Sequence, residues 1–243
     1  MCVCFFFKDT ATTEIYPRSL HDALPICHEL GGSADRTSTA ALADLDGDGD
    51  LDLVVGNDRP DDKRIYFNDG EGHFTLVGTF GDPQWPTRNV TVADLNGDDR
   101  PEIIVANRGG PENRSANYIC FNDGNGTFPA CEVLSRESAT TIAAGDLTGD
   151  GFVDLFVPHR DGGQSYLFVN DGSGGFNERH EVGPAHSATR AVALGDLDGD
   201  GLLDLVVGDQ VDGGVWLSLH GAIRLAARGE SVWSSGAAAS LKK

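Results

Sequence analysis

The sequence has few basic residues and no long apolar run. It contains 18 Lys and Arg against 38 Asp and Glu, which gives a formal net charge of −20. No basic stripe is available to neutralise a phosphate backbone, so the composition argues against nucleic-acid binding. No stretch approaches the ~20 apolar residues of a membrane-spanning helix. We therefore expect neither a nucleic-acid partner nor a membrane span.

Signatures of common catalytic centres are also missing. The sequence has no H-E-x-x-H zinc motif, no G-x-S-x-G nucleophile elbow and no P-loop, and its seven His are scattered. The repeated region described next lacks a long apolar stripe with the 3.6-residue period of a helix. The sequence therefore predicts an all-β protein without a catalytic site of its own.

An acidic, Gly-rich loop does occur, and it returns four times. The loop reads D-L-D-G-D-G-D-L-D from Asp44, D-L-N-G-D-D-R-P-E from Asp94, D-L-T-G-D-G-F-V-D from Asp146 and D-L-D-G-D-G-L-L-D from Asp196. Successive copies start 50 to 52 residues apart. A constant period of this size is typical of propellers and similar repeat arrays.

Each loop places side-chain oxygens at positions one, three, five and nine, and position seven can offer its backbone carbonyl. This donor set suits a hard cation, so we expect one Ca²⁺ in each loop, about four ions in all. Gly at positions four and six lets the chain curl at positive φ, and Asp99 takes the place of the second Gly in loop two. The expected ligands are Asp44, Asp46, Asp48, Asp50 and Asp52 in loop one (44–52); Asp94, Asn96, Asp98, Arg100 and Glu102 in loop two (94–102); Asp146, Thr148, Asp150, Phe152 and Asp154 in loop three (146–154); and Asp196, Asp198, Asp200, Leu202 and Asp204 in loop four (196–204).

The four loops are not equal. Loops one and four supply Asp at all four side-chain positions, whereas Asn96 and Thr148 place neutral donors at position three of loops two and three. An EF-hand is excluded because its position twelve needs Glu, and loop one has Val55 there within an apolar run. The alternative is a set of solvated acidic turns without metal.

A second motif, N-D-G-x-G-x-F, follows three of the loops and starts at Asn68, Asn122 and Asn170. Asn and Gly tolerate positive φ, so the motif predicts a hairpin turn. In the first repeat we expect strands at 38–43, 53–56, 64–67 and 74–79. Four short strands per repeat predict a four-stranded blade.

Together the two motifs resemble the FG-GAP/VCBS repeats of calcium-binding β-propellers, over residues 27–219. Proteins with such repeats include integrin α-chains, bacterial secreted proteins, some lectins and some polysaccharide lyases. The resemblance implies an all-β propeller with about four four-stranded blades. Complete family propellers commonly have seven blades, or sometimes six or eight, so we expect a fragment of a larger propeller.

Both ends depart from the repeat. Residues 1–26 lack the unbroken apolar core of a signal peptide, and 9–26 resemble a translated sequencing adapter, so we interpret 1–26 as a non-native leader. The alternative is a genuine N-terminal extension. Residues 28–30 resemble the end of a fourth strand from an upstream blade. Residues 220–243 match no repeat and are interpreted as an atypical tail that arose from a frameshift or a chimeric join. Neither end offers a closing strand, so we expect residues 27–219 to form an open arc.

Strand order places the connections between second and third strands, and those between blades, opposite the acidic loops. In integrin-like relatives the ligand face is also opposite the metal loops. The candidate ligand-binding residues there are Trp85, Arg108, Arg114, His159 and Arg160, with Arg88 beside them. Their ligand would be an acidic glycan or a protein carboxylate. The alternative is ordinary solvated loop residues.

Cys120 and Cys131 flank the second N-D-G turn and are a candidate disulfide, the alternative being two buried thiols. Cytosolic calcium is too scarce to fill weak sites, so we expect a secreted, extracellular or cell-surface protein. Three functions are consistent with these features. They are a calcium-stabilised propeller module for binding or adhesion, a non-catalytic portion of a secreted carbohydrate-active enzyme such as a polysaccharide lyase, and a purely structural domain of a larger secreted chain.

Overall fold

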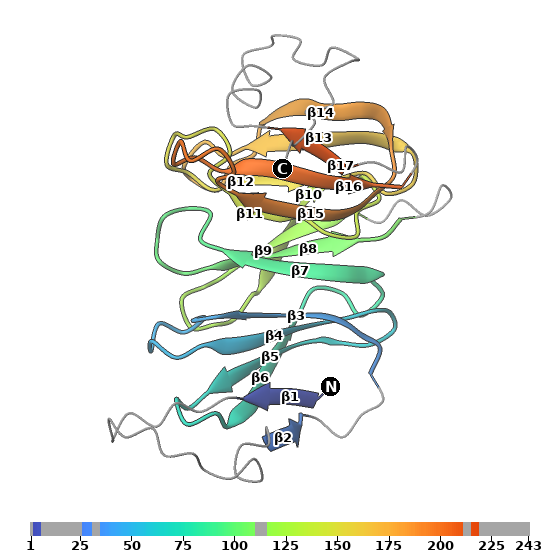
Figure 1. Ribbon diagram of the computed structural model, residues 1–243. Coiled ribbons are helices and arrows are strands. Elements are labelled where there is room, and N and C mark those ends of the chain that lie inside the picture. Colours follow the sequence, from blue (N-terminus) through green and yellow to red (C-terminus); the bar gives the residue numbers. More distant parts are fainter. Residues whose placement is uncertain (1, 6–25, 31–34, 110–115, 211–214, 219–243) are drawn as a thin grey trace, which may run out of the picture.

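The computed structural model describes residues 2–5, 26–30, 35–109, 116–210 and 215–218. Every regular element in these ranges is a β-strand (Figure 1). Among the described residues, accordingly, no helix is long and apolar enough to cross a membrane. The predicted all-β fold class is confirmed.

Consecutive strands pair antiparallel into small sheets, one for each repeat. Blade one is β3 (Thr37–Ala43), β4 (Asp52–Asn57), β5 (Lys63–Asn68) and β6 (Phe74–Phe80); blade two is β7 (Thr87–Ala93), β8 (Glu102–Asn107), β9 (Asn117–Phe121) and β10 (Ala130–Ser135); blade three is β11 (Ala143–Gly145), β12 (Asp154–Val157), β13 (Gly163–Val169) and β14 (Glu178–Ser187). Blade four has three strands within the described residues: β15 (Thr189–Gly195), β16 (Asp204–Asp209) and β17 (Val215–Ser218). Each strand of blade one lies within one or two residues of its predicted range. The propeller-like blades are therefore confirmed.

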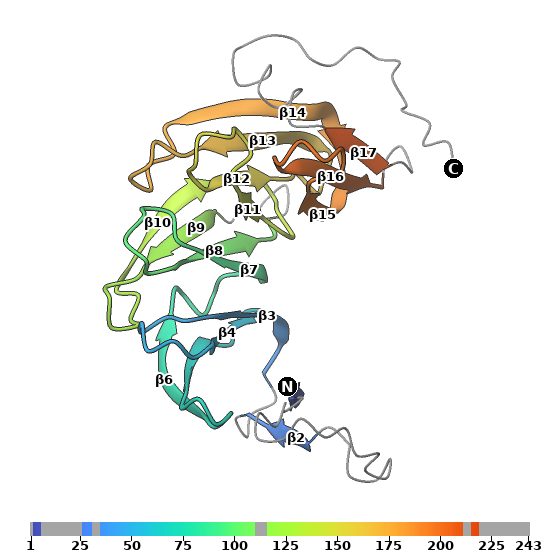
Figure 2. The same ribbon diagram turned by 60° about the vertical axis from the view of Figure 1, so that its left-hand side comes forward.

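The blades stack face to face in a curved row (Figure 2). The first strands β3, β7, β11 and β15 line the inner side of this curve, and β3 contacts β7, β7 contacts β11, and β11 contacts β15. Blades one and four lie at its two ends. The described residues thus have the shape of an open arc.

Apolar residues fill the spaces between successive blades. Val54 and Ile65 of blade one pack with Val90, Ile103 and Val105 of blade two, and similar clusters join blades two and three and blades three and four. The second strands β4, β8 and β12 are buried along their whole length because blades or neighbouring strands cover both faces. This explains their continuous apolar runs, such as L-V-V and I-I-V, in place of the alternation typical of a half-exposed strand.

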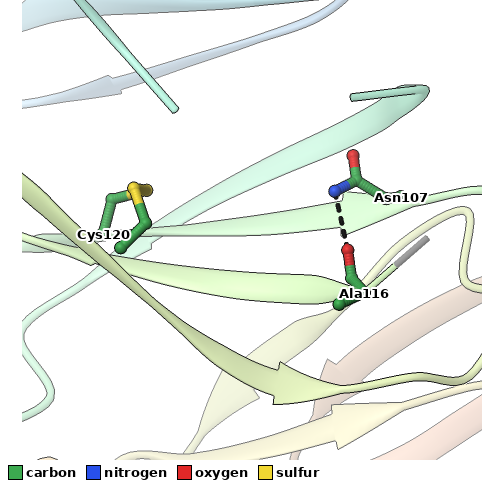
Figure 3. Close-up of a disulfide and its surroundings, with 4 residues drawn as sticks. Asn107, Ala116 and Cys120 are labelled. Carbon is green, nitrogen blue, oxygen red and sulfur yellow. Dashed lines mark hydrogen bonds between the residues drawn. A yellow bond between two sulfur atoms is a disulfide. The ribbon is translucent and has the colours of Figure 1, made fainter. Parts of the chain in front are cut away.

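A disulfide reinforces the outer hairpin of blade two. Cys120 and Cys131 lie directly opposite each other on β9 and β10, and their sulfur atoms are 2.01 Å apart, as the candidate pairing predicted. In the same blade, the Asn107 amide donates a 2.8 Å hydrogen bond to the Ala116 carbonyl (Figure 3). That bond ties together the second and third strands on either side of residues 110–115.

The N-terminal strand differs from the prediction. Residues 28–30 do not end a fourth strand of a blade. Instead β2 (Ile26–Glu29) pairs antiparallel with β1 (Cys2–Phe5) in a separate two-stranded sheet. A fourth strand needs a third strand beside it, and the described residues provide none upstream of blade one. Residues 6–25 and 219–243, which include most of the predicted leader and the whole of the predicted tail, lie outside the described residues.

Candidate metal-binding loops and the face opposite them

All four acidic loops join the first strand of a blade to the second, so they lie at the same end of the blades. The N-D-G turns join third and fourth strands, which places them at that end too. The antiparallel strand order therefore brings loop and turn together in blades one, two and three.

The position-one aspartate shapes each loop from within. In loop one, the carboxylate of Asp44 accepts hydrogen bonds from the backbone N–H groups of Gly47 (2.8 Å) and Gly49 (3.0 Å). The same two bonds, from positions four and six, recur in the other three loops. Both glycines have positive φ, 81° and 93°, and Asp99 adopts φ 63° at the equivalent place in loop two, as predicted. The residue types at positions one, four and six thus produce the tight curl.

In loop one, the carboxylates at positions three and five each leave one oxygen without a hydrogen bond. In loop one, Asp46 Oδ1 accepts from the N–H of Asp48 (3.2 Å), and Asp48 Oδ1 accepts from the N–H of Asp50 (2.9 Å). Their second oxygens accept no hydrogen bond from the described residues. Ligand oxygens of Asp44, Asp46 and Asp48 lie within 4.8 Å of one another. Such a cluster, with oxygen donors only, has the chemistry of a hard-cation site.

Loop four makes a comparable cluster, with ligand oxygens of Asp196, Asp198 and Asp204 within 4.8 Å of one another. Loops two and three bring fewer carboxylates together because Asn96 and Thr148 occupy position three. The expected ranking of the loops is therefore consistent with the arrangement of their side chains.

The position-nine carboxylate is fully buried in all four loops, at Asp52, Glu102, Asp154 and Asp204. Asp52 accepts hydrogen bonds from the N–H groups of Leu45 (2.9 Å) and Asn68 (2.9 Å), and thereby connects the acidic loop to the N-D-G turn. Burial raises the pKa of Asp52 and Asp154, and it raises the pKa of Glu102 to about 6, although backbone N–H donors oppose the shift. A cation beside these groups would stabilise their charged form.

Two buried polar atoms at ligand positions have no hydrogen-bond partner. They are Glu102 Oε1, at position nine of loop two, and Thr148 Oγ1, at position three of loop three. Buried polar atoms in folded proteins are rarely left unpaired. Both atoms are oxygens of the kind a hard cation binds, so the side chains present fit a bound ion.

Side chains at position seven pack on the N-D-G turns, which the sequence did not reveal. Phe152 lies against Gly172, and a Cβ atom added there would be 2.7 Å from the ring. Asp50 and Arg100 lie against Gly70 and Gly124 in the same way. A side chain in place of the Gly of N-D-G would therefore force these side chains to move, in addition to the strain of a positive φ. Because these three side chains pack on the turns, we expect position seven to offer an ion its backbone carbonyl.

The Asn of the N-D-G motif links neighbouring blades. Asn122 of blade two donates through its side-chain amide to the carbonyl of Leu45 in loop one (2.9 Å), and Asn170 of blade three donates to Leu95 in loop two (2.7 Å). These residues lie 77 and 75 positions apart in the sequence. Each acidic loop is thus connected to the turn of the following blade, in the two cases that the described residues contain.

On the opposite face, two of the predicted ligand residues are engaged in packing. Trp85 stacks on Tyr118, with ring centroids 3.9 Å apart, and its other contacts include the backbone of Gly81. His159 accepts a hydrogen bond from the Asp161 N–H at Nδ1 (3.2 Å), and burial lowers its pKa. Neither ring is freely presented to a ligand.

The predicted arginines of this face differ in exposure. Arg108 is exposed and Arg160 is half-buried, while Arg114 lies outside the described residues. Near Arg160 the structure also brings Arg190, which the sequence reasoning missed because this residue lies inside a strand and not in a connection.

A family model for the FG-GAP-like repeat matches residues 44–105, 100–157 and 146–207. Cartilage acidic protein 1 of Homo sapiens is 32% identical over 153 residues, which cover 56% of this chain and 22% of that protein. The Mus musculus protein is 31% identical over 153 residues and is covered to 23%. The chain therefore spans less than a quarter of the length of these curated relatives.

Two solved structures are similar over 74% of this chain. One is the Photorhabdus luminescens Tc holotoxin pore, with a TM-score of 0.49, 24% identity and 9% of that chain covered. The other is the V. cholerae biofilm matrix protein Bap1, with a TM-score of 0.44, 23% identity and 26% covered.

Proposed function

The chain belongs to the FG-GAP-like repeat family, and we propose that it is a calcium-stabilised extracellular β-propeller module that binds a glycan or protein ligand. The observation that carries the calcium part is the repetition of one donor arrangement in four loops. All four loops have oxygen-bearing side chains at positions one, three, five and nine, and in loops one and four the ligand oxygens of three carboxylates lie within 4.8 Å of one another. Solvated acidic turns would not need this shared arrangement.

Calcium is favoured over other ions by the donor chemistry. The loops offer carboxylate, amide, hydroxyl and carbonyl oxygens, with no His or Cys among the predicted ligands. Ca²⁺ accepts six to eight oxygen ligands in flexible geometry, whereas Mg²⁺ demands near-ideal octahedral geometry and keeps much of its water. A bound Ca²⁺ would offset the repulsion between the carboxylates and give Glu102 Oε1 and Thr148 Oγ1 a partner.

An extracellular location is supported by two independent features. Weak calcium sites are filled at extracellular but not at cytosolic calcium concentrations, and disulfides such as Cys120–Cys131 persist in oxidising compartments. The related cartilage acidic protein 1 bears a name that describes an acidic protein of cartilage, and this chain has a net charge of −20. We assign the chain a binding role and not a catalytic one, because its repeated groups can hold ions and ligands.

Thermal unfolding with and without Ca²⁺ tests this proposal. Each site held at ten times its Kd should add roughly 1.4 kcal/mol of stability by mass action, so EDTA should lower the Tm sharply. Mg²⁺ should not restore it. Asp44→Asn should reduce the calcium response, whereas the control Glu132→Gln, which removes the same charge from an exposed site in β10, should keep it. An EDTA melt that matches the calcium melt would rule out calcium stabilisation.

A further inference from the structure

Four arginines from three successive blades lie close together on the face of the protein opposite the acidic loops. Arg88 and Arg190 are the second residues of β7 and β15, the inner strands of blades two and four. Arg108 and Arg160 follow the second strands of blades two and three. The backbone N–H of Arg108 donates to the carbonyl of Pro86, just before β7 (3.0 Å), and that of Arg160 donates to the carbonyl of Ser138, in the connection that leads to β11 (2.9 Å). We call these four residues the arginine arc.

Local contacts hold two of these side chains in place. Arg190 donates from Nη1 to the carbonyl of Arg160 (3.0 Å) and from Nε to Gln210 Oε1 (2.7 Å), so it bridges blades three and four. Arg88 forms a 2.8 Å ion pair with Asp58 and bridges blades one and two. Contacts between neighbouring blades therefore hold the guanidinium groups of Arg88 and Arg190 in place.

The arginine arc has an excess of positive charge. Asp58 faces Arg88, and Asp161 lies 3.4 Å from Arg160, but Arg108 and Arg190 have no carboxylate partner among the described residues. The pKa of Arg160 is lowered by burial and then by the charges of Arg108 and Arg190, with a smaller effect of Arg88, while Asp161 opposes the shift. Four like charges thus lie close together on a chain whose net charge is −20.

We propose that the arginine arc binds an acidic polysaccharide through its carboxylate or sulfate groups. This inference rests on the ligand-binding role proposed above and names the ligand class and the residues. Planar guanidinium groups form paired, charge-assisted hydrogen bonds with such anions, and an anion would relieve the repulsion among the arginines. A chain of sugars with regularly spaced charges suits an arc that extends over three blades.

Other anionic ligands fit this surface less well. Protein ligands usually insert aromatic or apolar anchors into pockets, but the ring of Trp85 is stacked on Tyr118. Among the large apolar side chains that are exposed in the described residues, only Val215, the first residue of β17, lies at this end of the blades. Nucleic acid carries a phosphate at every nucleotide, and four arginines on a chain with a net charge of −20 are too few to neutralise so dense a charge.

The test measures binding of the full chain to immobilised oligosaccharides of equal length, in Ca²⁺ and 0.15 M salt. The probes are a sulfated, a uronate-bearing and a neutral glycan, with an oligoglutamate peptide and a single-stranded oligonucleotide as the competing classes. Arg108→Gln and Arg190→Gln should each weaken binding of the acidic glycans by about tenfold, the cost of losing one charge-assisted contact. The matched control is Arg179→Gln, an exposed arginine near the start of the outer strand β14, at the end of the blade that carries the N-D-G turn, which should bind as the unaltered chain does.

Each outcome has one meaning. Loss of acidic-glycan binding in the two arc variants, with the control intact, supports the proposal. No binding of either acidic glycan, equal binding by arc variants and control, or tighter binding of peptide or oligonucleotide overturns it. The same samples are melted with Ca²⁺ and with EDTA. A chain that is stabilised by Ca²⁺ but binds no acidic glycan refutes the arginine arc alone, whereas glycan binding without calcium stabilisation refutes the calcium proposal alone.

Discussion

Replacing Asn170 by Ala should destabilise the protein more than the same change at Asn68, although both residues start an N-D-G turn. Asn170 donates its side-chain amide to Val153 in its own blade (3.0 Å) and to Leu95 in the preceding blade (2.7 Å). Asn68 donates only to Leu51, the own-blade equivalent of Val153 (3.2 Å). In both residues the side-chain carbonyl accepts N–H groups from the turn itself.

The two substitutions therefore differ by one bond between blades and by one bond within the turn, because Asn170 accepts two N–H groups of its turn and Asn68 accepts one. Losing a hydrogen bond while leaving a buried carbonyl unpaired costs about 1–3 kcal/mol. Leu95 is only 2% exposed, so water cannot readily replace the lost donor. For a chain of this size each kcal/mol lowers the Tm by roughly 2–4 °C. Asn170→Ala should then melt several degrees below Asn68→Ala.

Thermal melts in saturating Ca²⁺ measure this difference. Asn122 makes the equivalent contact between blades two and one, because its side-chain amide donates to the carbonyl of Leu45 (2.9 Å). Asn122→Ala should therefore melt like Asn170→Ala. If all three variants melt together, the bonds between blades contribute nothing measurable and the coupling inferred from them is wrong.

The remaining predictions concern the loops. Asp48→Ala should weaken the tightest phase of a calorimetric Ca²⁺ titration more than Asp150→Ala, because loop one has four Asp ligands and loop three has Thr148 in place of one; the reverse order would contradict the ranking. In the ion-free folded protein, burial raises the pKa of Glu102 from 4.5 to about 6. As the pH rises, the unfolded chain therefore loses this proton at a lower pH than the folded chain does. Ion-free stability should therefore fall by about 2 kcal/mol between pH 4.5 and 6, and Glu102→Gln should remove that fall. Urea midpoints across this range check the prediction, and parallel pH profiles of the two proteins would refute it.

The features that the sequence predicted well are local ones. The acidic loops, the N-D-G turns and the strands between them depend on residues a few positions apart, such as Asp44 with Gly47 and Gly49, and positive φ at these sites follows from residue type. The pairing of Cys120 with Cys131 was accessible for the same reason, because a short hairpin turn fixes which residues lie opposite each other.

Contacts between blades could not be inferred in this way. Nothing in the motif indicates that the amide of Asn170 reaches Leu95, because the contact depends on how blades stack. Trp85 was predicted to face a ligand, yet stacking on Tyr118 decides its environment. Arg190 was overlooked because the sequence reasoning considered only the connections between strands. As the second residue of β15, Arg190 lies where that strand begins, which is at the face opposite the acidic loops.

The buried position-nine carboxylate explains why the acidic loop and the N-D-G turn occur together. Asp154 accepts the N–H of Asn170 (3.0 Å), and the same Asn donates to Leu95 in the loop of the preceding blade. An ion that holds Asp154 in its charged form would therefore also hold the turn that steadies the neighbouring loop. In a repeat array, stability is set largely by such contacts between neighbours. Ion binding in one blade should consequently stabilise the neighbouring blade too, so the stability of each blade depends on the blade beside it as well as on its own loop.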